Sequence, residues 1–330
     1  MKACCMRMIT VFVAAATLPS TLLGQSMVEF PTKPVRIIVT QPPGGANDIV
    51  ARLLSSRLSE NLGQQFVVDD RGTAGVAGLA VLTTVAKTTP DGYTLLAVNS
   101  DFTISPALYK NFPIDPIRDF APISLVARAP YLLVVNASRP IMSVNDLVTL
   151  ARAQPGKLTF GAGNTGSGVH LSTMWFMLAT NIKATYIPYK GASPALLDLV
   201  GGRIDASLTN VLSSGPLVRS GQLHALGVST AERSKVLPDV PTIAEQGVPG
   251  YDAYSFQGYL APAKTPLPIV NKLSAEFAKV VKLPDITRRF SDDGSEPIGD
   301  TPAQFGQIIA AEILRWRNLV KDVGITLEDQ

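Results

Sequence analysis

The chain has 330 residues, of which 46% are hydrophobic and 17% are charged. This length and composition exclude an intrinsically disordered chain and predict one large or two medium folded domains. The 29 basic and 26 acidic residues give a net charge of only +3, and the basic residues neither form a run nor interleave with aromatic ones. The sequence therefore lacks the electrostatic signature of a nucleic-acid-binding protein.

The first 25 residues are typical of a secretory signal peptide. Lys2 and Arg7 give a positively charged start, and a mostly apolar stretch follows over residues 8–24, which is the order found in such signals. An uncleaved membrane anchor is the alternative, but a stretch of roughly 17 residues that contains Pro19 is short for a membrane span. We therefore expect residues 1–25 to be removed and the mature protein to be periplasmic.

Removal of this segment changes two bulk properties. Both cysteines, Cys4 and Cys5, lie within it, so the mature protein would have no disulfide and no cysteine-based metal site. Loss of Lys2 and Arg7 leaves 27 basic and 26 acidic residues, a net charge of +1. We expect the secreted chain to be stabilised by its hydrophobic core alone.

Strand-like and helix-like segments alternate through the first part of the mature chain. A β-branched run at residues 35–40 precedes a turn-rich stretch, and Asn47 is placed to cap the helix that follows. Further strands are expected at residues 66–68 and 94–98, with a helical stretch rich in alanine and glycine between them. This βαβαβ order predicts a parallel sheet covered by helices on both faces.

The chain changes character at residues 122–136, where two extended runs follow each other without a helix between them. We expect these runs to cross between two lobes. Alternation then resumes with a helix for which Ser143 and Asp146 form a capping pair. The expected strands of this part are residues 158–160, 184–189, 204–208 and 223–229, and the expected helices are residues 147–153, 170–180 and a segment that begins at Ser193-Pro194 and ends at Gly201.

The last third of the chain contains three predicted helices. Thr242 and Glu245 form a capping-box pattern, and Thr301 with Gln304 forms another, with proline at the first helical position. Between them, residues 268–281 place apolar side chains along one stripe. We expect the final helix to pack back on the first lobe.

Two glycine-rich loops, at residues 42–48 and 161–168, are the strongest chemical features. Each follows a predicted strand and precedes a predicted helix, so inward-facing backbone amides and a helix start could hold an anion without a cationic side chain. For the first loop, a plain strand-to-helix turn is the alternative, and Asp48 suits the first helical turn on structural grounds alone. The second loop contains G-x-G-x-x-G but no acidic residue occurs up to Leu197, which disfavours dinucleotide binding.

Residues for catalysis or for a metal site are not found. His170 and His224 are the only histidines, Ser167 does not lie in a G-x-S-x-G motif, and no His/Asp/Glu cluster has metal-ligand spacing. We therefore expect no enzyme activity, no metal and no cofactor. His170 is interpreted as a residue that fixes the second loop by a hydrogen bond, and Tyr189 either lines a cleft or ends a strand.

A series of sequence blocks resembles one known family, the tripartite tricarboxylate transporter receptors of the Bordetella uptake (Bug/TctC-like) type. The resemblance extends over residues 30–325 and keeps the family's order of blocks. These blocks are VRIIV, PPGGANDIVARLL, GQQFVVDDR, PDGYTLL, PALYKN, RDFAPISLVAR, GNTGSGVHL, IPYKGASPALLDLVGGRID, LPDVPTIAEQGVPGY and LAPAKTP.

The resemblance implies an α/β, type II periplasmic binding protein fold, with two lobes of mainly parallel sheets joined by crossing strands. Lobe 1 would comprise residues 26–124 and 230–330, and lobe 2 residues 125–229. The protein would be a monomer that captures a small carboxylate, such as a di- or tricarboxylate, an acidic amino acid or an aromatic acid, and delivers it to the membrane subunits of a transporter. A receptor that feeds a sensor kinase is an alternative, and a periplasmic hydrolase is a weaker one.

The resemblance also implies which residues contact the ligand. These are Gln41, Pro43, Gly44, Gly45, Ala46, Asn47, Asp48, Ser100 and Asp101 in the first lobe, and Gly163, Asn164, Thr165, Gly166, Ser167, His170, Tyr189 and Thr209 in the second. The chain departs from the family pattern at Gln41, where an aromatic is common, and at Thr209, where aspartate is frequent. It also departs at Phe256-Gln257, where Trp-Phe or similar is usual, and at Asp101, where small or amide residues are frequent. Because Asp101 would repel a dicarboxylate, we expect either a ligand with a hydrogen-bond donor or an Asp101 that is turned outward.

Overall fold

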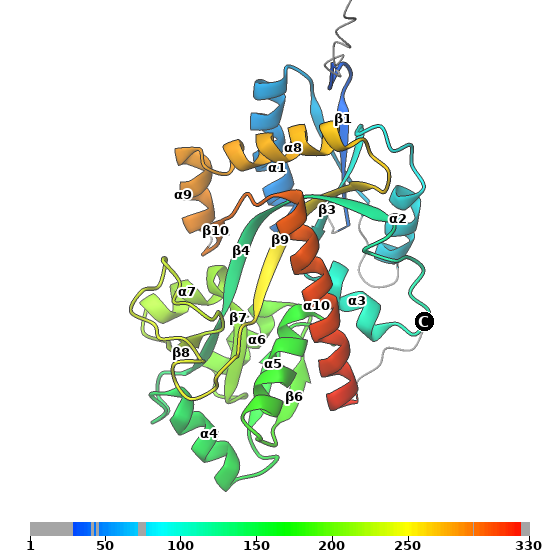
Figure 1. The fold of residues 1–330 in the computed structure, drawn as a ribbon. Coiled ribbons are helices and arrows are strands. Elements are labelled where there is room, and N and C mark those ends of the chain that lie inside the picture. The colour runs from blue at the N-terminus through cyan, green and yellow to red at the C-terminus, as the bar shows by residue number, and fades with distance from the viewer. Residues whose placement is uncertain (1–28, 41–42, 44–45, 72–76, 293, 325–330) are drawn as a thin grey trace, which may run out of the picture.

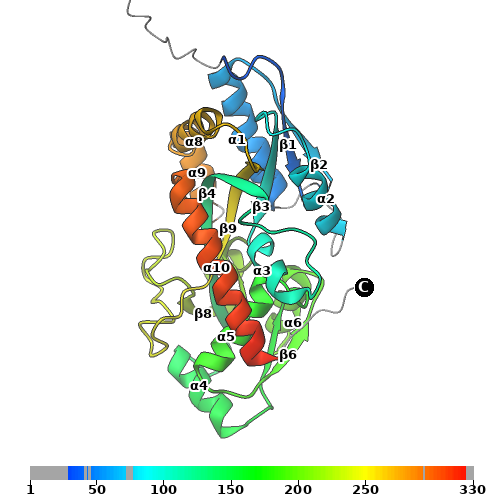
Figure 2. The ribbon, with the colours of Figure 1, turned by 45° about the vertical axis from the view of Figure 1, so that its right-hand side comes forward.

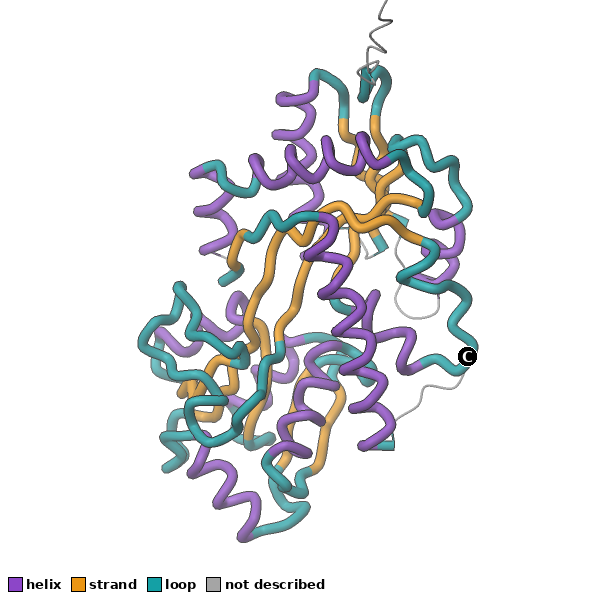
Figure 3. Tube along the Cα trace, viewed as in Figure 1, coloured by secondary structure: helices purple, strands orange, loops and turns teal. Residues whose placement is uncertain are grey.

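The chain forms two lobes, stacked one above the other in Figure 1. The computed structural model describes residues 29–40, 43, 46–71, 77–292 and 294–324, and the expected signal peptide lies outside these residues. Long strands run from one lobe to the other in Figure 3. This architecture is the two-lobed α/β arrangement that the sequence predicts.

The sheet of the first lobe begins with the expected βαβαβ pattern. Its elements are β1 (Val35–Val39), β2 (Phe66–Asp70), β3 (Thr94–Asn99), β9 (Tyr254–Pro262), α1 (Ala46–Leu62), α2 (Ala77–Ala86), α8 (Leu267–Val280), α9 (Pro284–Asp292) and α10 (Pro302–Val323). Strands β2, β1 and β3 pair in parallel in that order, and β9 joins β3 in the antiparallel direction. Leu54 of α1 and Phe277 of α8 are buried in one core, whereas Leu82 of α2 and Phe305 of α10 are buried in another. The two cores cover the two faces of the sheet.

The two extended runs expected at residues 122–136 form one continuous strand, β4 (Phe120–Asn136). Its first half pairs with β9 in the first lobe. Its second half pairs with β7 (Ala206–Asn210) and β8 (Leu223–Val228) in the second lobe. A short strand, β10 (Glu296–Pro297), also pairs with β4. The strand β4 therefore crosses between the lobes, as predicted.

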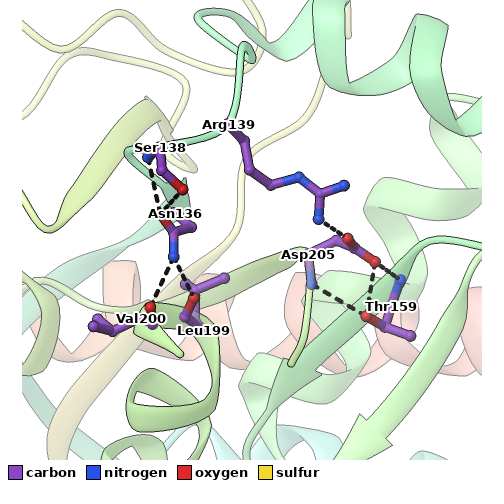
Figure 4. Close-up of polar contacts among 7 residues, drawn as sticks. All are labelled: Asn136, Ser138, Arg139, Thr159, Leu199, Val200 and Asp205. Carbon is purple, nitrogen blue, oxygen red and sulfur yellow. Dashed lines mark hydrogen bonds and ion pairs between the residues drawn. The ribbon is translucent and has the colours of Figure 1, made fainter. Parts of the chain in front are cut away.

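The second lobe is a smaller α/β unit. Its further elements are β5 (Thr159–Ala162), β6 (Thr185–Pro188), α4 (Val144–Ala153), α5 (Gly168–Ala179), α6 (Ala192–Val200) and α7 (Val211–Arg219). Polar side chains join the ends of these elements (Figure 4): Asp205 accepts hydrogen bonds from the Thr159 backbone and hydroxyl at 2.8 Å each and pairs with Arg139. The Asn136 amide donates to the Val200 carbonyl at 2.8 Å. These contacts hold β4, β5 and α6 together.

The segment between β8 and β9 contradicts one prediction. Thr242 and Glu245 make both hydrogen bonds of a capping box, at 2.9 Å each, but the residues that follow form only turns. Gly247 has a φ of +99°, which ends any helix immediately. Ile243, Val248 and Tyr251 are buried in the core of the second lobe. We therefore propose that the second lobe extends to the start of β9.

Of the other predicted helix caps, two are confirmed and two are wrong, and the helices at residues 101–108, 211–219 and 284–292 were not predicted. Ser143 and Thr301 are the N-caps of α4 and α10, and Thr301 with Gln304 forms a complete capping box. The prediction for Asn47 is wrong, because α1 already begins at Ala46 and the Asn47 amide donates to the Ala97 carbonyl at 3.0 Å. The predicted N-cap at Ser193 is also wrong, because the N-cap of α6 is glycine 191.

Helix α10 packs on the first lobe as predicted, but it continues beyond it. It has 22 residues and is therefore about 33 Å long. Its first half buries Phe305 and Ile309 in the first lobe. Its second half buries Trp316 against Leu171 of α5 and against α3 (Asp101–Leu108). The helix therefore lies along both lobes, as Figure 2 shows.

Asp300, directly before α10, attaches this helix to the crossing strand. Its Oδ1 atom accepts a hydrogen bond from the Leu125 backbone of β4 at 2.7 Å, and its backbone carbonyl accepts one from the Ser124 hydroxyl at 2.9 Å. The Oδ2 atom is buried and has no hydrogen-bond partner in the described part of the chain. Burial raises the pKa of this carboxyl to about 6, although the Leu125 and Ser124 hydrogen bonds oppose the shift.

We expect Asp300→Asn to remove a pH dependence of stability. Because the folded pKa of about 6 lies above the ordinary value of 3.8, the native state binds the proton more tightly, and this contribution to stability falls as the pH rises from about 4 to about 6. Because Asp300 is only half-buried, solvent screening reduces the cost of the ionised carboxylate to about 1–2 kcal/mol above pH 6. The side-chain oxygen of the asparagine can still accept the hydrogen bond from the Leu125 backbone amide. The variant should therefore be more stable than the wild-type protein at pH 8.

Urea denaturation between pH 4 and pH 8 measures this effect. The matched control is Asp322→Asn, which removes an exposed carboxylate from α10 and should follow the wild-type profile. A wild-type pH profile retained in Asp300→Asn would contradict the prediction.

Candidate ligand-binding cleft

A cleft of about 490 Å³ lies between the two lobes, within the size range of small-molecule sites. Residues at or next to the start of five helices line it: Ala46 of α1, Asp101 of α3, Gly168 of α5, Ala192 of α6 and Asn210 before α7. In α/β folds, ligands bind at the carboxyl ends of the strands, where such helices begin. The helix starts contribute partial positive charge, so they favour an anionic ligand.

The second glycine-rich loop contributes directly to the cleft wall. Gly163, Asn164 and Ser167 line the cleft together with Gly168, and Ser167 is the N-cap of α5. The loop is held from behind, because the Tyr186 hydroxyl donates to the Gly163 carbonyl at 2.6 Å. The loop therefore presents a fixed backbone to the cleft.

His170 is buried and also holds this loop. Its Nδ1 atom accepts a hydrogen bond from the Gly166 backbone at 3.0 Å, and its ring packs on Tyr186 with centroids 4.3 Å apart. His170 is not among the residues that line the cleft. This geometry supports the interpretation of His170 as a loop-fixing residue. Burial lowers the pKa of the His170 imidazole to about 4, so the ring is neutral and able to accept at neutral pH.

We expect His170→Ala to weaken carboxylate binding about 10-fold, because the Gly166 amide loses its acceptor and the loop loses its orientation. Since the folded pKa lies below the ordinary value of 6.5, the stability from this group is present above about pH 6.5 and is lost as the pH falls to about 4. The Asp300 carboxyl changes the free energy of unfolding in the opposite direction over part of this pH range. Each variant is therefore compared separately with wild type.

Isothermal titration and thermal unfolding from pH 4 to pH 8 test the prediction. His224→Ala is the control, because His224 lies outside the cleft lining. Equal affinity in His170→Ala and wild type would contradict the role assigned to the ring.

The first glycine-rich loop is described only in part. Gln41, Gly44 and Gly45 lie outside the described residues, Pro43 is exposed, and Ala46 lines the cleft.

Asn47 and Asp48 were also expected at the ligand, but both are buried and neither lines the cleft. The Asp48 carboxylate pairs with Arg52 at 2.6 Å, and Arg52 also pairs with Asp70 of β2. Because the Asn47 amide reaches β3, both side chains fix α1 to the sheet.

Three other expected residues lie beside the cleft rather than in its lining. Thr165 is exposed and Gly166 is half-buried in the second loop, but neither is a lining residue. The Tyr189 hydroxyl donates to Asp198 at 2.8 Å, which directs the side chain towards α6. The neighbouring Gly191 and Ala192 line the cleft in its place.

Ser100, Asp101 and Thr209 lie in the cleft, as expected. Asp101 is the only charged side chain among the described lining residues, and none of these residues is cationic. The Asn99 amide donates to the Asp101 carboxylate at 3.1 Å. Although Asp101 is exposed to the cleft, the surrounding protein displaces water and raises the pKa of its carboxyl, and the Asn99 hydrogen bond opposes this shift.

Several lining residues were not predicted from the sequence. They include Asn99, Tyr131 and Ser207 among the polar side chains, and Ile49, Leu212 and Phe290 among the large apolar ones. Gln257, where the chain departs from the family pattern, also lines the cleft. Asn99 could have been found, because it directly follows a predicted strand and precedes the expected Ser100 and Asp101. Tyr131 lies within an apolar strand and gives no local signal of its position. Burial raises the pKa of its phenol, so the hydroxyl remains protonated.

Neither a metal site nor a membrane-spanning helix is found among the described residues. No group of three or more His, Cys, Asp and Glu side chains there is arranged to hold a metal ion. In the same part of the chain, no helix combines the length and the apolar character that crossing a membrane requires.

Comparisons with known proteins identify the family. Residues 50–325 match the family described as "Tripartite tricarboxylate transporter family receptor". BugT of Bordetella pertussis is 34% identical over 322 residues, which cover 97% of each chain. The structure of R. palustris Rpa4515 with adipate is 39% identical, with a TM-score of 0.76 over 90% of this chain and 99% of that one. MatC from Rhodopseudomonas palustris with bound malate is 30% identical, with a TM-score of 0.72 over 88% of this chain and 100% of that one.

These similarities extend over both lobes and confirm the family and the periplasmic binding protein fold predicted from the sequence. Two further solved structures that resemble this chain are described as the periplasmic binding protein BugD, at 29% identity, and as a TctC solute binding protein from Polaromonas, at 26% identity. This chain therefore belongs to the tripartite tricarboxylate transporter receptor family.

Proposed function

We propose that this protein binds a small carboxylate between its lobes and delivers it to the membrane subunits of a tripartite tricarboxylate transporter. The observation that carries the proposal is the convergence of five helix starts on a cleft whose described lining has no cationic side chain. Backbone amides and helix starts can bind a carboxylate in such a site. The adipate and malate of Rpa4515 and MatC support the same ligand class.

In the proposed complex, the second glycine-rich loop holds the carboxylate from one lobe and the start of α1 holds it from the other. The lining residues predicted from the sequence that would take part are Ala46, Ser100, Asp101, Gly163, Asn164, Ser167 and Thr209. Movement of the lobes about β4 and β9 would then enclose the ligand. Exposed Ile49 of α1 and Leu212 of α7 line the cleft from opposite lobes, so closure would also remove apolar surface from water.

A panel of carboxylates tests the binding function. Thermal unfolding and isothermal titration of the mature protein with adipate, malate, succinate, citrate and benzoate should show at least one ligand that raises the melting temperature. The matched controls are the corresponding diols and amides, which keep the carbon skeleton but lack the negative charge. Failure of every carboxylate, together with binding of an uncharged analogue, would overturn the proposal.

The cellular role requires a separate measurement. We propose that residues 1–25 are a signal peptide and that the mature protein is a periplasmic monomer. Deletion of the gene should abolish uptake of the radiolabelled ligand, and a plasmid copy should restore it. Normal uptake combined with loss of ligand-induced transcription would instead favour delivery to a sensor kinase.

A further inference from the structure

One wall of the cleft carries polar side chains, and one of their acceptor oxygens has no hydrogen-bond partner among the described residues. Asn99 of β3 and Gln257 of β9 are directly paired across the two strands, so their side chains are neighbours on one face of the sheet. Asn99 in turn donates to Asp101 at 3.1 Å. Asp101, Asn99 and Gln257 therefore form one continuous polar surface on the first-lobe side, which we call the acceptor wall.

The acceptor wall contains an unused buried acceptor. Gln257 is 8% exposed, and its Oε1 atom has no hydrogen-bond partner within the described residues. A buried carbonyl oxygen without a donor costs free energy, because it has lost water and gained nothing in exchange. Such a group in a ligand cleft indicates that the ligand supplies the donor.

Two unused hydroxyls contribute from the second lobe. Ser207 and Thr209 lie two residues apart on β7 and both line the cleft, so their side chains share one face of the strand. They are 1% and 3% exposed, and in the described part of the chain neither hydroxyl oxygen has a hydrogen-bond partner. The cleft thus offers unsatisfied polar groups from both lobes.

The negative charge of the acceptor wall determines which hydrogen-bond donor group a ligand should carry. Asp101 is the only charged side chain of the described lining, so its negative charge has no cationic partner there. A second carboxylate of a ligand would be repelled at this wall, and a hydroxyl would leave the charge uncompensated. An ammonium group would donate hydrogen bonds to Asp101 and Gln257 and would also neutralise the charge.

We infer that Asp101 selects a ligand that carries a protonated amine in addition to the carboxylate held by the second glycine-rich loop and the start of α1. This inference rests on the proposed carboxylate-binding function and adds the chemistry of the second ligand group. Asp101 is then the counter-ion of the ammonium, Gln257 is a second acceptor for it, and Asn99 keeps the Asp101 carboxylate in place.

Pairs of ligands that differ in one group provide the test. Isothermal titration of the wild-type protein compares 4-aminobutanoate with glutarate and with 4-hydroxybutanoate, and compares glutamate with glutarate and with 2-hydroxyglutarate. In at least one series, the amine-bearing ligand should bind at least about 10-fold more tightly than the matched diacid and the matched hydroxy acid.

Substitutions in the acceptor wall test whether it causes the preference for amine-bearing ligands. Asp101→Asn should weaken binding of the amine-bearing ligand by about 10- to 100-fold and should leave the matched diacid unchanged or improve it. Gln257→Leu should weaken the same ligand by a smaller factor. The control is Asp239→Asn, which removes an exposed carboxylate outside the cleft lining and should change neither affinity. Thermal unfolding of the unliganded variants verifies that each one is folded.

The outcomes separate this inference from the proposed function. If diacids or hydroxy acids bind as tightly as their amine-bearing partners, or if Asp101→Asn weakens all of them equally, the inference is overturned while carboxylate binding stands. If no carboxylate of either panel binds, the proposed function itself fails.

Discussion

Replacement of Trp316 by alanine is expected to lower the free energy of unfolding by about 3–5 kcal/mol, the usual cost of removing a buried tryptophan. The Trp316 side chain is 1% exposed and lies where α10, α3 and α5 meet. Its ring contacts Trp175 of α5 edge-on, with centroids 6.5 Å apart, and Trp175 in turn packs on Tyr251 at 4.8 Å. The substitution would leave a cavity where α10 meets the second lobe.

Urea denaturation of the mature protein measures this loss. Trp316→Phe keeps an aromatic ring at the site and should lose less stability than Trp316→Ala. Arg317→Ala changes the next residue, which is exposed, and should stay within about 0.5 kcal/mol of wild type. A loss below about 1 kcal/mol in Trp316→Ala would show that the second half of α10 does not support the fold.

Polar contacts reinforce the same attachment of α10. The Arg315 guanidinium donates to the Asp252 carbonyl at 2.7 Å and lies 5.2 Å from the centre of the Trp175 ring. It also pairs with buried Glu312 at 3.0 Å, and Glu312 accepts from the Tyr254 hydroxyl at 3.2 Å. These contacts join α10 to α5 and to the segment before β9. None of the described residues that line the cleft belongs to α10, so this attachment leaves the ligand site open.

The sequence predicts the fold wherever the determining signal is local. Ser143 and Thr301 cap their helices because each needs only a backbone amide three residues away. The same pattern at Thr242 forms its hydrogen bonds but no helix, because Gly247 and the burial of Ile243 in the second lobe decide the path of the chain. The contact of the second half of α10 with the second lobe was not predicted, for a related reason. An apolar stripe shows that Trp316 is buried, but not which lobe buries it.

The residues of the candidate site show the same difference between local and long-range signals. Ser100 and Asp101 were expected from the family resemblance, and Gly163 also from its glycine-rich loop, and all three lie in the cleft. Gln257 reaches the cleft only through the pairing of β9 with β3, and Tyr131 only through the crossing of β4, and neither depends on nearby sequence. Asn47 and Asp48 show the opposite error. They lie in the first turn of α1, which lines the cleft at Ala46, but their side chains pair with Ala97 and Arg52 within the first lobe.

The second large effect is expected at Gly168, the first residue of α5. A Cβ atom there would lie 2.6 Å from the Tyr131 hydroxyl oxygen and 3.5 Å from Ile104 of α3. The first distance is far below a normal contact, so Gly168→Ala must displace either the phenol or the start of α5. Overpacking of this kind costs about 1–3 kcal/mol. Because Gly168 and Tyr131 both line the cleft, we also expect carboxylate affinity to fall about 10- to 100-fold.

A double-mutant cycle identifies the cause of the Gly168→Ala effect. Tyr131→Phe removes the oxygen that the new methyl group would meet, so the double variant should recover most of the stability lost in Gly168→Ala.

Gly306→Ala is the matched control. A Cβ there meets only Pro122, at 3.5 Å, and alanine favours the helical conformation of α10, so stability should hold or rise by about 0.5–1 kcal/mol. If Gly168→Ala has the same free energy of unfolding and the same carboxylate affinity as wild type, Tyr131 does not approach α5 this closely in solution. If Tyr131→Phe restores stability but not affinity, the phenol hydroxyl itself contacts the ligand, which agrees with its place in the cleft wall.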